Sequence, residues 1–410
     1  MSQKAIYITI GILAALGVLL FVAGLILVQQ NKIPGIEPKT VFETFPFGEG
    51  SAAKNVVQKP PVDLSKPEET LPRDSSQSFG ALRKISTRPI AGAVIFEKDK
   101  KTFTRYVEKQ TGHVYEADGG TGGAQRISNT TVPGILHAFW DGSGESVALR
   151  YLTDGGVIKT VAARISVATT TNTGALTGTP LPDNIREVVV SPSQKKIFYI
   201  LSLGNAAVGT VAESDGTKKK QVFDSSATEW NAEWINTNTI TLLTKPSAFS
   251  NGFLYSLHSG TGAFKKIMGG ISGLTARASK DVSKVLFSAS ANNSFETFVY
   301  SVKNNAVTPF PITTLPEKCL WSSDNITLYC GAPESIPAGA YPDIWYQGRV
   351  SFSDTVWKID TETGALDILA IPADDAREEI DLINPMLDRN EKILIFTNKK
   401  SSSLWSLQLP

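Results

Sequence analysis

The sequence predicts an all-β fold in which seven repeats close into a ring. Seven times an aromatic or apolar strand runs into a turn, most plainly at 255–263 and 357–365. A second pattern recurs beside it, an apolar first strand, a polar turn and a strongly β second strand, clearest at 188–200. Steps of 50, 43, 45, 43 and 65 residues separate the second strands, anchored on Val147, Ile197, Ile240, Val285, Leu328 and Ile393. A period in the forties with four strands per unit is typical of a β-propeller.

The seventh repeat ends one strand short, at 404–410. The segment 80–85, just ahead of the first repeat, has the pattern of the missing partner. A ring of sheets with an open joint would expose two sheet edges, and pairing these segments covers both. We therefore expect a seven-bladed propeller over residues 79–410, closed by an N-terminal strand through Leu82, Lys84, Ile85, Trp405 and Leu407.

Residues 5–28 are uncharged and rich in Ile, Leu, Val, Ala and Gly. A helix of this length, rising about 1.5 Å per residue, spans a hydrocarbon core of about 30 Å. A cleaved signal peptide has a shorter apolar stretch of about 7–15 residues and a small-x-small site, so an uncleaved anchor is favoured. We expect residues 1–4 to form a short cytoplasmic tail, and the chain after Lys32 to lie outside the cytoplasmic membrane.

Residues 29–78 hold seven prolines and few periodic apolar positions, which predicts a proline-rich tether. Its aromatic stretch 41–47 is interpreted as a segment folded onto the propeller, with a docking peptide as the alternative.

The chain carries 40 basic and 39 acidic side chains. This balance gives no basic footprint for nucleic acid, so no nucleic-acid partner is predicted. Aspartates recur in the first inter-strand turns, but Asp is favoured there because its side chain bonds the nearby backbone. The recurring aspartates are therefore interpreted as turn residues rather than metal ligands: Asp141, Asp281, Asp324 and Asp388. Neither a metal site nor a cofactor is predicted.

No catalytic residue is predicted. The three histidines are accompanied by no Gly-x-Ser-x-Gly motif, and His258 occupies the turn position that Asp360 holds in another repeat. Facing carboxylates for glycoside cleavage could come only from Glu187, Glu229 and Glu317, and the sequence leaves open whether two of them face each other. A series of tryptophans is expected to pack between blades rather than to bind a ligand: Trp140, Trp234 and Trp321.

The two cysteines are eleven positions apart. If Asp324–Asn325 is the hairpin tip, Cys319 and Cys330 lie opposite each other on adjacent strands. A one-residue slip, or two unlinked buried thiols, are the alternatives. We expect a disulfide because an exported chain lies in an oxidising compartment.

The last step of the repeat is about 20 residues longer than the others because of an insertion at 332–350 in the sixth unit. Insertions on a rigid scaffold carry binding disproportionately. Four of its residues are of types enriched at interface hot spots, and we expect them to contact a partner: Tyr341, Trp345, Tyr346 and Arg349. The alternative is that the loop packs over the blade edge.

The motifs at 191–199 and 357–360 resemble those of WD40-like and TolB-like propeller repeat proteins, and the resemblance extends over about 79–410. It implies the fold and little about chemistry. By analogy with propellers in general, we expect a non-catalytic scaffold that binds another envelope or surface protein. The alternative is a propeller that binds a small molecule or a glycan in its central channel. This alternative includes a hydrolytic enzyme.

Overall fold

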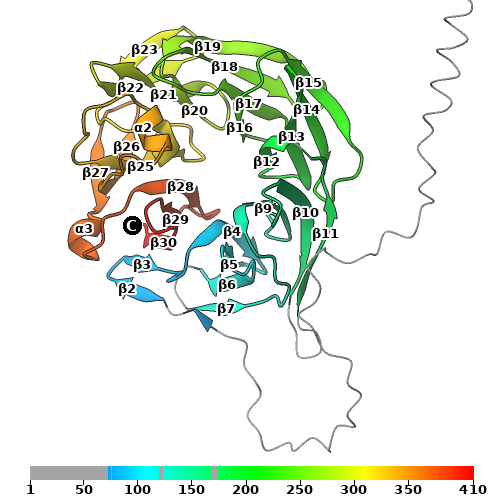
Figure 1. Cartoon of the computed structure of the whole chain (residues 1–410). Helices are drawn as coiled ribbons and strands as arrows, with labels where there is room; N and C mark the ends of the chain where they lie inside the picture. Colours follow the sequence, from blue (N-terminus) through cyan, green and yellow to red (C-terminus); the bar gives the residue numbers. More distant parts are fainter. Residues whose placement is uncertain (1–72, 75, 120–122, 168–173, 184) are drawn as a thin grey trace, which may run out of the picture. The chain divides into compact units, whose positions relative to one another are not determined.

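Seven antiparallel sheets arranged around a ring make up the part of the chain that the computed structural model describes, residues 73–410 apart from 75, 120–122, 168–173 and 184 (Figure 1). The all-β, seven-bladed architecture is confirmed. Among these described residues no helix is both long and apolar enough to cross a bilayer. The expected anchor, 5–28, and the tether up to residue 72 lie outside the described residues.

Each blade is counted from its inner strand outwards. Blade 1 contains β4 (Ile90–Lys98), β5 (Lys101–Glu108), β6 (Val114–Asp118), β7 (Ala124–Arg126) and, at its outer edge, β1 (Arg73–Asp74). Blade 2 contains β8 (Ile135–Trp140), β9 (Ser146–Leu152), β10 (Ile158–Ser166) and β11 (Ala175–Pro180). Blade 3 contains β12 (Ile185–Val190), β13 (Lys196–Leu203), β14 (Ala206–Glu213) and β15 (Lys220–Ser225). Blade 4 contains β16 (Trp230–Trp234), β17 (Thr239–Thr244), β18 (Asn251–His258) and β19 (Phe264–Ser272).

Blade 5 contains β20 (Thr275–Ala278), β21 (Lys284–Ala291), β22 (Ser294–Ser301) and β23 (Ala306–Pro309). Blade 6 follows a short 3-10 helix, η1 (Pro316–Lys318), and contains β24 (Cys319–Trp321), β25 (Thr327–Pro333), β26 (Asp354–Asp360) and β27 (Leu366–Ala370). Helix α2 (Asp343–Tyr346) lies within its insertion, and α3 (Pro372–Asp375) follows the blade. Blade 7 contains β28 (Leu382–Leu387), β29 (Ile393–Asn398), β30 (Leu404–Gln408), β3 (Leu82–Lys84) and β2 (Gln77–Phe79).

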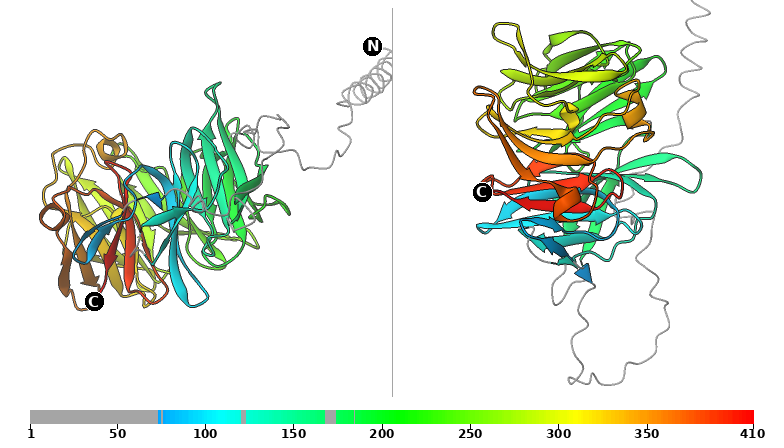
Figure 2. Two further views of the ribbon diagram at one scale, coloured as in Figure 1. Left: turned by 90° about the horizontal axis from the view of Figure 1, so that it is seen from below. Right: turned by 90° about the vertical axis from the view of Figure 1, so that its left-hand side faces the viewer.

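The ring closes where β3 pairs with β30, and the two strands lie side by side in both views of Figure 2. Leu82 is opposite Leu407 and Lys84 is opposite Trp405. The backbone N–H of Ile85 donates to the Leu404 carbonyl at 2.8 Å, which extends the pairing by one residue. Blade 7 thus takes strands from both ends of the described chain.

The strands begin earlier than the predicted boundary at 79. Strand β1 pairs with β7 in blade 1, and β2 pairs with β3 in blade 7. Strands β1 and β2 are only two and three residues long, so their sequences carry no strand periodicity. Their positions depend on distant partners: the buried Asp74 carboxylate accepts hydrogen bonds from Thr87 Oγ1 (2.5 Å) and the Tyr106 hydroxyl (3.1 Å).

The core lies between neighbouring blades. Trp140, Trp234 and Trp321 are all buried, which confirms their predicted packing role. Trp140 Nε1 donates to the Gly92 carbonyl at 3.4 Å, and Trp321 Nε1 donates to the Arg277 carbonyl at 3.1 Å. Each bond reaches back to the inner strand of the preceding blade. The rings of Trp140 and Trp321 therefore each join two consecutive blades.

Each outer strand leads into the inner strand of the next blade, so all inner strands run in the same direction along the ring axis. The loops between second and third strands consequently share one face, which we call the hairpin face: 109–113, 153–157, 204–205, 245–250, 292–293, 334–353 and 399–403. The turns between first and second strands occupy the opposite face, called the turn face. The insertion therefore belongs to the hairpin face.

Candidate functional site

The insertion is fixed to three other blades of the hairpin face. The Asp343 carboxylate accepts a hydrogen bond from Ser247 Oγ (3.0 Å) in the blade 4 hairpin. The backbone N–H of Gly339 donates to the blade 5 hairpin at 2.7 Å. Lys399 Nζ, in the blade 7 hairpin, donates to the Trp345 carbonyl at 2.8 Å. The insertion is therefore an ordered cover over blades 4 to 7 rather than a free loop.

The four residues expected to contact a partner divide into two pairs. Tyr341 and Trp345 are 0 % and 3 % exposed, in a cluster with Phe295, Leu315 and Phe352. This burial corrects the expectation that both rings are available at the surface: they form the insertion's own core, whose apolar burial offsets the entropy of ordering the loop. Tyr346 and Arg349 are exposed. Of the four insertion residues, only Tyr346 and Arg349 remain candidates for direct contact with a partner.

Exposed apolar side chains concentrate on the hairpin face. Of the ten large hydrophobic side chains exposed in the described residues, six lie on or beside its loops, in blades 2, 3, 4 and 6: Leu152, Val157, Ile158, Leu203, Phe249 and Tyr346. The other four lie on the outer strands of blades 4 to 6: Phe264, Val307, Leu366 and Ile368. Isolated exposed apolar residues are ordinary, whereas their accumulation on one face is typical of an interaction surface. Sequence reasoning missed all of these except Tyr346, because a single apolar residue at a hairpin end carries no signal of exposure.

The three candidate carboxylates each have a different partner, and only Glu187 lies within an inner strand. Glu187 accepts one long hydrogen bond, from the Ala232 N–H at 3.4 Å, and burial raises the pKa of its carboxyl to about 7. Glu229 forms an exposed ion pair with Lys245 at 2.8 Å. Glu317 accepts a hydrogen bond from the Tyr346 hydroxyl. Burial raises the pKa of Glu317, and this bond opposes the shift.

A cavity of about 500 Å³ opens on the turn face between blades 5, 6 and 7. Its charged lining includes both signs: Arg277, Lys280, Asp388, Arg389 and Glu391. Four of these groups already have partners. Arg277 Nε bonds Glu233 at 2.8 Å and Glu391 accepts from Ser322 Oγ at 2.6 Å. Arg389 Nη1 lies 3.9 Å from Glu97, and Asp388 accepts from the Ile393 N–H. The cavity joins residues from three repeats, which sequence reasoning did not bring together.

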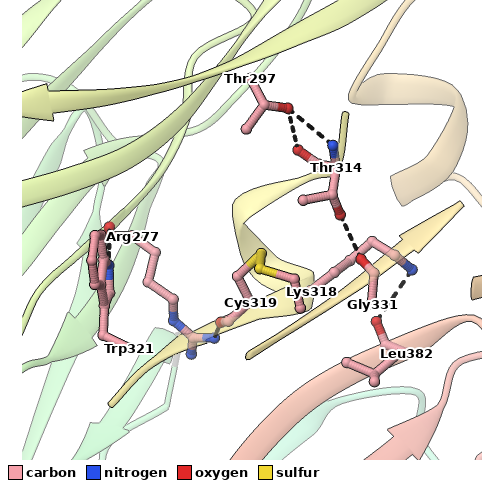
Figure 3. The surroundings of a disulfide bond; sticks show 9 residues. Arg277, Thr297, Thr314, Lys318, Cys319, Trp321, Gly331 and Leu382 are labelled. Atoms are coloured by element: carbon pink, nitrogen blue, oxygen red, sulfur yellow. Dashed lines mark hydrogen bonds between the residues drawn. A yellow bond between two sulfur atoms is a disulfide. The ribbon is translucent and has the colours of Figure 1, made fainter. Parts of the chain in front are cut away.

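The disulfide between Cys319 and Cys330 is present, and the two residues are direct partners in the pairing of β24 with β25 (Figure 3). The tip follows the predicted turn, where Asn325 has a φ of 59° and the Asp324 carboxylate accepts from two backbone N–H groups. Asparagine is one of the few residues that tolerate this left-handed conformation. The bridge fixes the strands from which the insertion departs.

Turn chemistry also accounts for His258 and the recurring aspartates. His258 Nδ1 accepts from the backbone N–H groups of Gly260 (3.1 Å) and Thr261 (3.2 Å), as Asp360 does in its own turn. The carboxylate of Asp388 bonds the backbone N–H of Ile393 at 2.7 Å. Within the part of the chain that the structure describes, no group of three His, Cys, Asp or Glu side chains could hold a metal ion.

No protein-family model matches the chain, and no curated protein matches it. Among solved structures, an oligogalacturonate lyase in complex with manganese is similar at 11 % identity, over 83 % of this chain and 96 % of that chain, with a TM-score of 0.53. The oligogalacturonate lyase of Vibrio parahaemolyticus is similar at 10 % identity, over 80 % and 93 %, with a TM-score of 0.52. TolB from Acinetobacter baumannii is similar at 10 % identity, over 73 % and 61 %, with a TM-score of 0.39. At these identities the two lyases show a common propeller fold alone.

Proposed function

We propose that this chain is a non-catalytic, extracytoplasmic scaffold whose hairpin face binds another envelope or surface protein. One observation carries the proposal, the accumulation of six exposed large apolar side chains on that face. Apolar area of this kind is the main source of favourable free energy when two proteins associate.

Phe249 is the leading contact residue because it is 84 % exposed beside the insertion. Its loop is held in place: Ala248 N–H donates to Asp343 at 2.7 Å, and Ser272 Oγ donates to the Ala248 carbonyl at 2.9 Å. A ring presented on a fixed backbone loses little conformational entropy on binding. Tyr346 and Arg349 extend the same surface on the insertion.

Partner capture from solubilised membranes tests the proposal. We expect Phe249→Ser with Leu203→Ser to lose at least about tenfold in partner affinity, since each removes an exposed apolar anchor. The matched control is Val307→Ser with Ile368→Ser, which changes side chains that are 53 % and 54 % exposed on outer strands. The control should keep the wild-type partners. If both double variants capture the partner as well as wild type does, the hairpin face is not the binding surface.

The proposed location is the cytoplasmic membrane, with one span at 5–28 and the propeller outside. The uncharged length of that segment supports it. The Cys319–Cys330 disulfide supports it too, because such bonds persist in oxidising compartments. Protease added to intact spheroplasts should degrade the propeller, and protection until lysis would contradict the orientation.

The alternative function is a small-molecule or glycan-binding propeller that uses the central channel. The cavity on the turn face favours it, because a volume of about 500 Å³ lies in the range of ligand sites. Arg389 would then supply a charged contact from the cavity wall. Screening oligosaccharides by calorimetry decides between the two: binding that Arg389→Ala abolishes, with partner capture unchanged, supports the alternative.

A further inference from the structure

A buried lysine lies at the junction of blades 6 and 7. The side chains of Lys318, Asp354 and Asp381 are all 0 % exposed. Lys318 Nζ is 2.6 Å from Asp354 Oδ2 and 2.5 Å from Asp381 Oδ1. It also donates to the Leu382 carbonyl at 3.2 Å, pointing away from the neighbouring disulfide (Figure 3). Lysine is almost never fully buried without such partners.

Two aromatic rings from the loop that joins β25 to β26 lie beside this amine. Its Nζ lies 5.4 Å from the centroid of the Trp345 ring and 5.2 Å from that of Phe352. Both rings are themselves buried, so they separate the three charged groups from water. Ions held away from water lose much of the favourable solvation they would have outside. A reaction that converts the ammonium and one carboxylate into a neutral group is favoured in this environment.

The two carboxylates have different hydrogen-bond partners. Asp381 accepts from Trp345 Nε1 (3.0 Å), Ser351 Oγ (3.0 Å) and the Phe352 N–H (3.2 Å), in addition to Lys318. These donors fix the orientation of the Asp381 side chain.

Asp354 accepts at Oδ2 only, from Lys318 and from the Leu382 N–H at 2.6 Å. Its Oδ1 is buried and has no hydrogen-bond partner among the residues that the structure describes. Burial raises the pKa of Asp354 to about 6, and the Lys318 charge only partly opposes the shift. The neutral acid is therefore accessible near neutral pH, and its carbonyl carbon is a better electrophile than that of a carboxylate.

We propose that Lys318 and Asp354 condense into an intramolecular isopeptide bond, with Asp381 as the proton-transferring residue. The amine is in contact with both the carboxyl and the base, and all three side chains are 0 % exposed. Such positioning provides most of what an intramolecular acyl transfer requires.

The step needs no oxidant, reductant or cofactor. One ammonium proton passes from Lys318 Nζ to Asp354 along their 2.6 Å contact, which gives a neutral amine and a neutral acid. The amine nitrogen attacks Cγ of Asp354, and the Nζ–Cγ bond forms. A second proton leaves the nitrogen and reaches the departing hydroxyl through Asp381, the Cγ–Oδ bond breaks, and water is released. Asp381 ends as it began, and the ion pair is replaced by a neutral amide.

The bond would join η1 to the first residue of β26, across the root of the insertion. Residues 319–353 would then form a covalently closed loop that contains the Cys319–Cys330 disulfide. The inference does not depend on the proposed partner binding. It concerns how the insertion is held over the hairpin face.

Intact-mass measurement of the full chain, denatured and with its disulfide reduced, tests the inference. We expect wild type to fall short of its sequence mass by one water relative to Asp354→Ala, which should show no such deficit. After trypsin treatment, the peptides that contain Lys318 and Asp354 should be recovered as one branched species without cleavage at Lys318. A wild-type deficit of zero with separate peptides would overturn the proposal, as would a bond to Asp381 instead.

Two further variants separate the roles of the groups. Asp381→Asn keeps both reacting side chains and should abolish the mass deficit, because no base remains to move the protons. The matched control, Asp343→Asn, changes a carboxylate within the insertion whose partners are in blade 4, and should keep the full deficit. Retention of the bond in Asp381→Asn would refute the assigned role of Asp381. Because the wild-type mass decides the main question, a variant that fails to fold does not weaken the test.

Discussion

Closure of the ring by β3 can be tested with one substitution, Leu82→Ala. Leu82 is 1 % exposed and packs in a cluster that includes Phe396, Trp405 and Leu407 of blade 7. It belongs to a segment more than three hundred residues away from its strand partner at Leu407. Its contribution to stability therefore measures how strongly the two ends of the ring hold each other.

The magnitude follows from the burial. Replacing Leu by Ala removes three buried carbon atoms, worth about 0.8 kcal/mol each, or about 2.4 kcal/mol in total. A residual cavity adds to this loss, so we expect the free energy of unfolding to fall by about 3 kcal/mol, within the range of about 2–5 kcal/mol typical of such substitutions. Val307→Ala, at a side chain 53 % exposed on an outer strand, should cost about 0.5 kcal/mol or less.

Urea unfolding of the purified full chain, followed by tryptophan fluorescence, measures both variants. Amide hydrogen exchange then locates the effect: in Leu82→Ala, exchange should rise in β30 well before it rises in β17, on the opposite side of the ring. A loss no larger than that of Val307→Ala would refute the reasoning. So would a rise in exchange that is equal in blades 4 and 7.

Three further predictions concern the site and its support. In the folded protein the pKa of Glu187 is about 7, against a usual 4.5, so the folded state binds this proton more tightly than the unfolded state. The free energy of unfolding should therefore rise as the pH falls from about 8 to 4.5. Glu187→Gln should remove that dependence and gain up to about 3 kcal/mol at pH 8, as measured by unfolding at several pH values. Replacing Cys319 and Cys330 by Ala opens a loop with a sequence separation of 11. It should cost about 3 kcal/mol, and an unchanged unfolding midpoint would contradict this. Asp343→Ala removes two hydrogen bonds to the blade 4 hairpin and should speed tryptic cleavage within the insertion, with no change in the cleavage pattern of blade 2 as its control.

Local patterning in the sequence accounts for most of the architecture. The second strands of blades 2 to 7 are β-rich segments bounded by polar turns, and those turns are satisfied by their own side chains, as at Asp324 and Asp388. Such interactions involve residues close in the chain, so they are visible in a linear sequence. The register that places Cys319 opposite Cys330 follows from the same hairpin.

The direction in which the insertion's side chains point did not follow from the sequence. An aromatic residue in a long loop has the same identity whether its ring faces a partner or the interior. Tyr341 and Trp345 turn inward because Phe295 and Asp381, distant in sequence, lie beneath them. Exposed Phe249 has no sequence signature that separates it from a core residue.

The sequence by itself determined the number of blades, the strand order within blades 2 to 6 and the hairpin that carries the disulfide, because these rest on contacts between near neighbours in the chain. Only the tertiary structure decided that Lys318 is sealed between two aspartates and that β1 joins blade 1. Both depend on residues that are tens of positions apart in the chain and meet only in the folded protein, so no local pattern in the sequence records them.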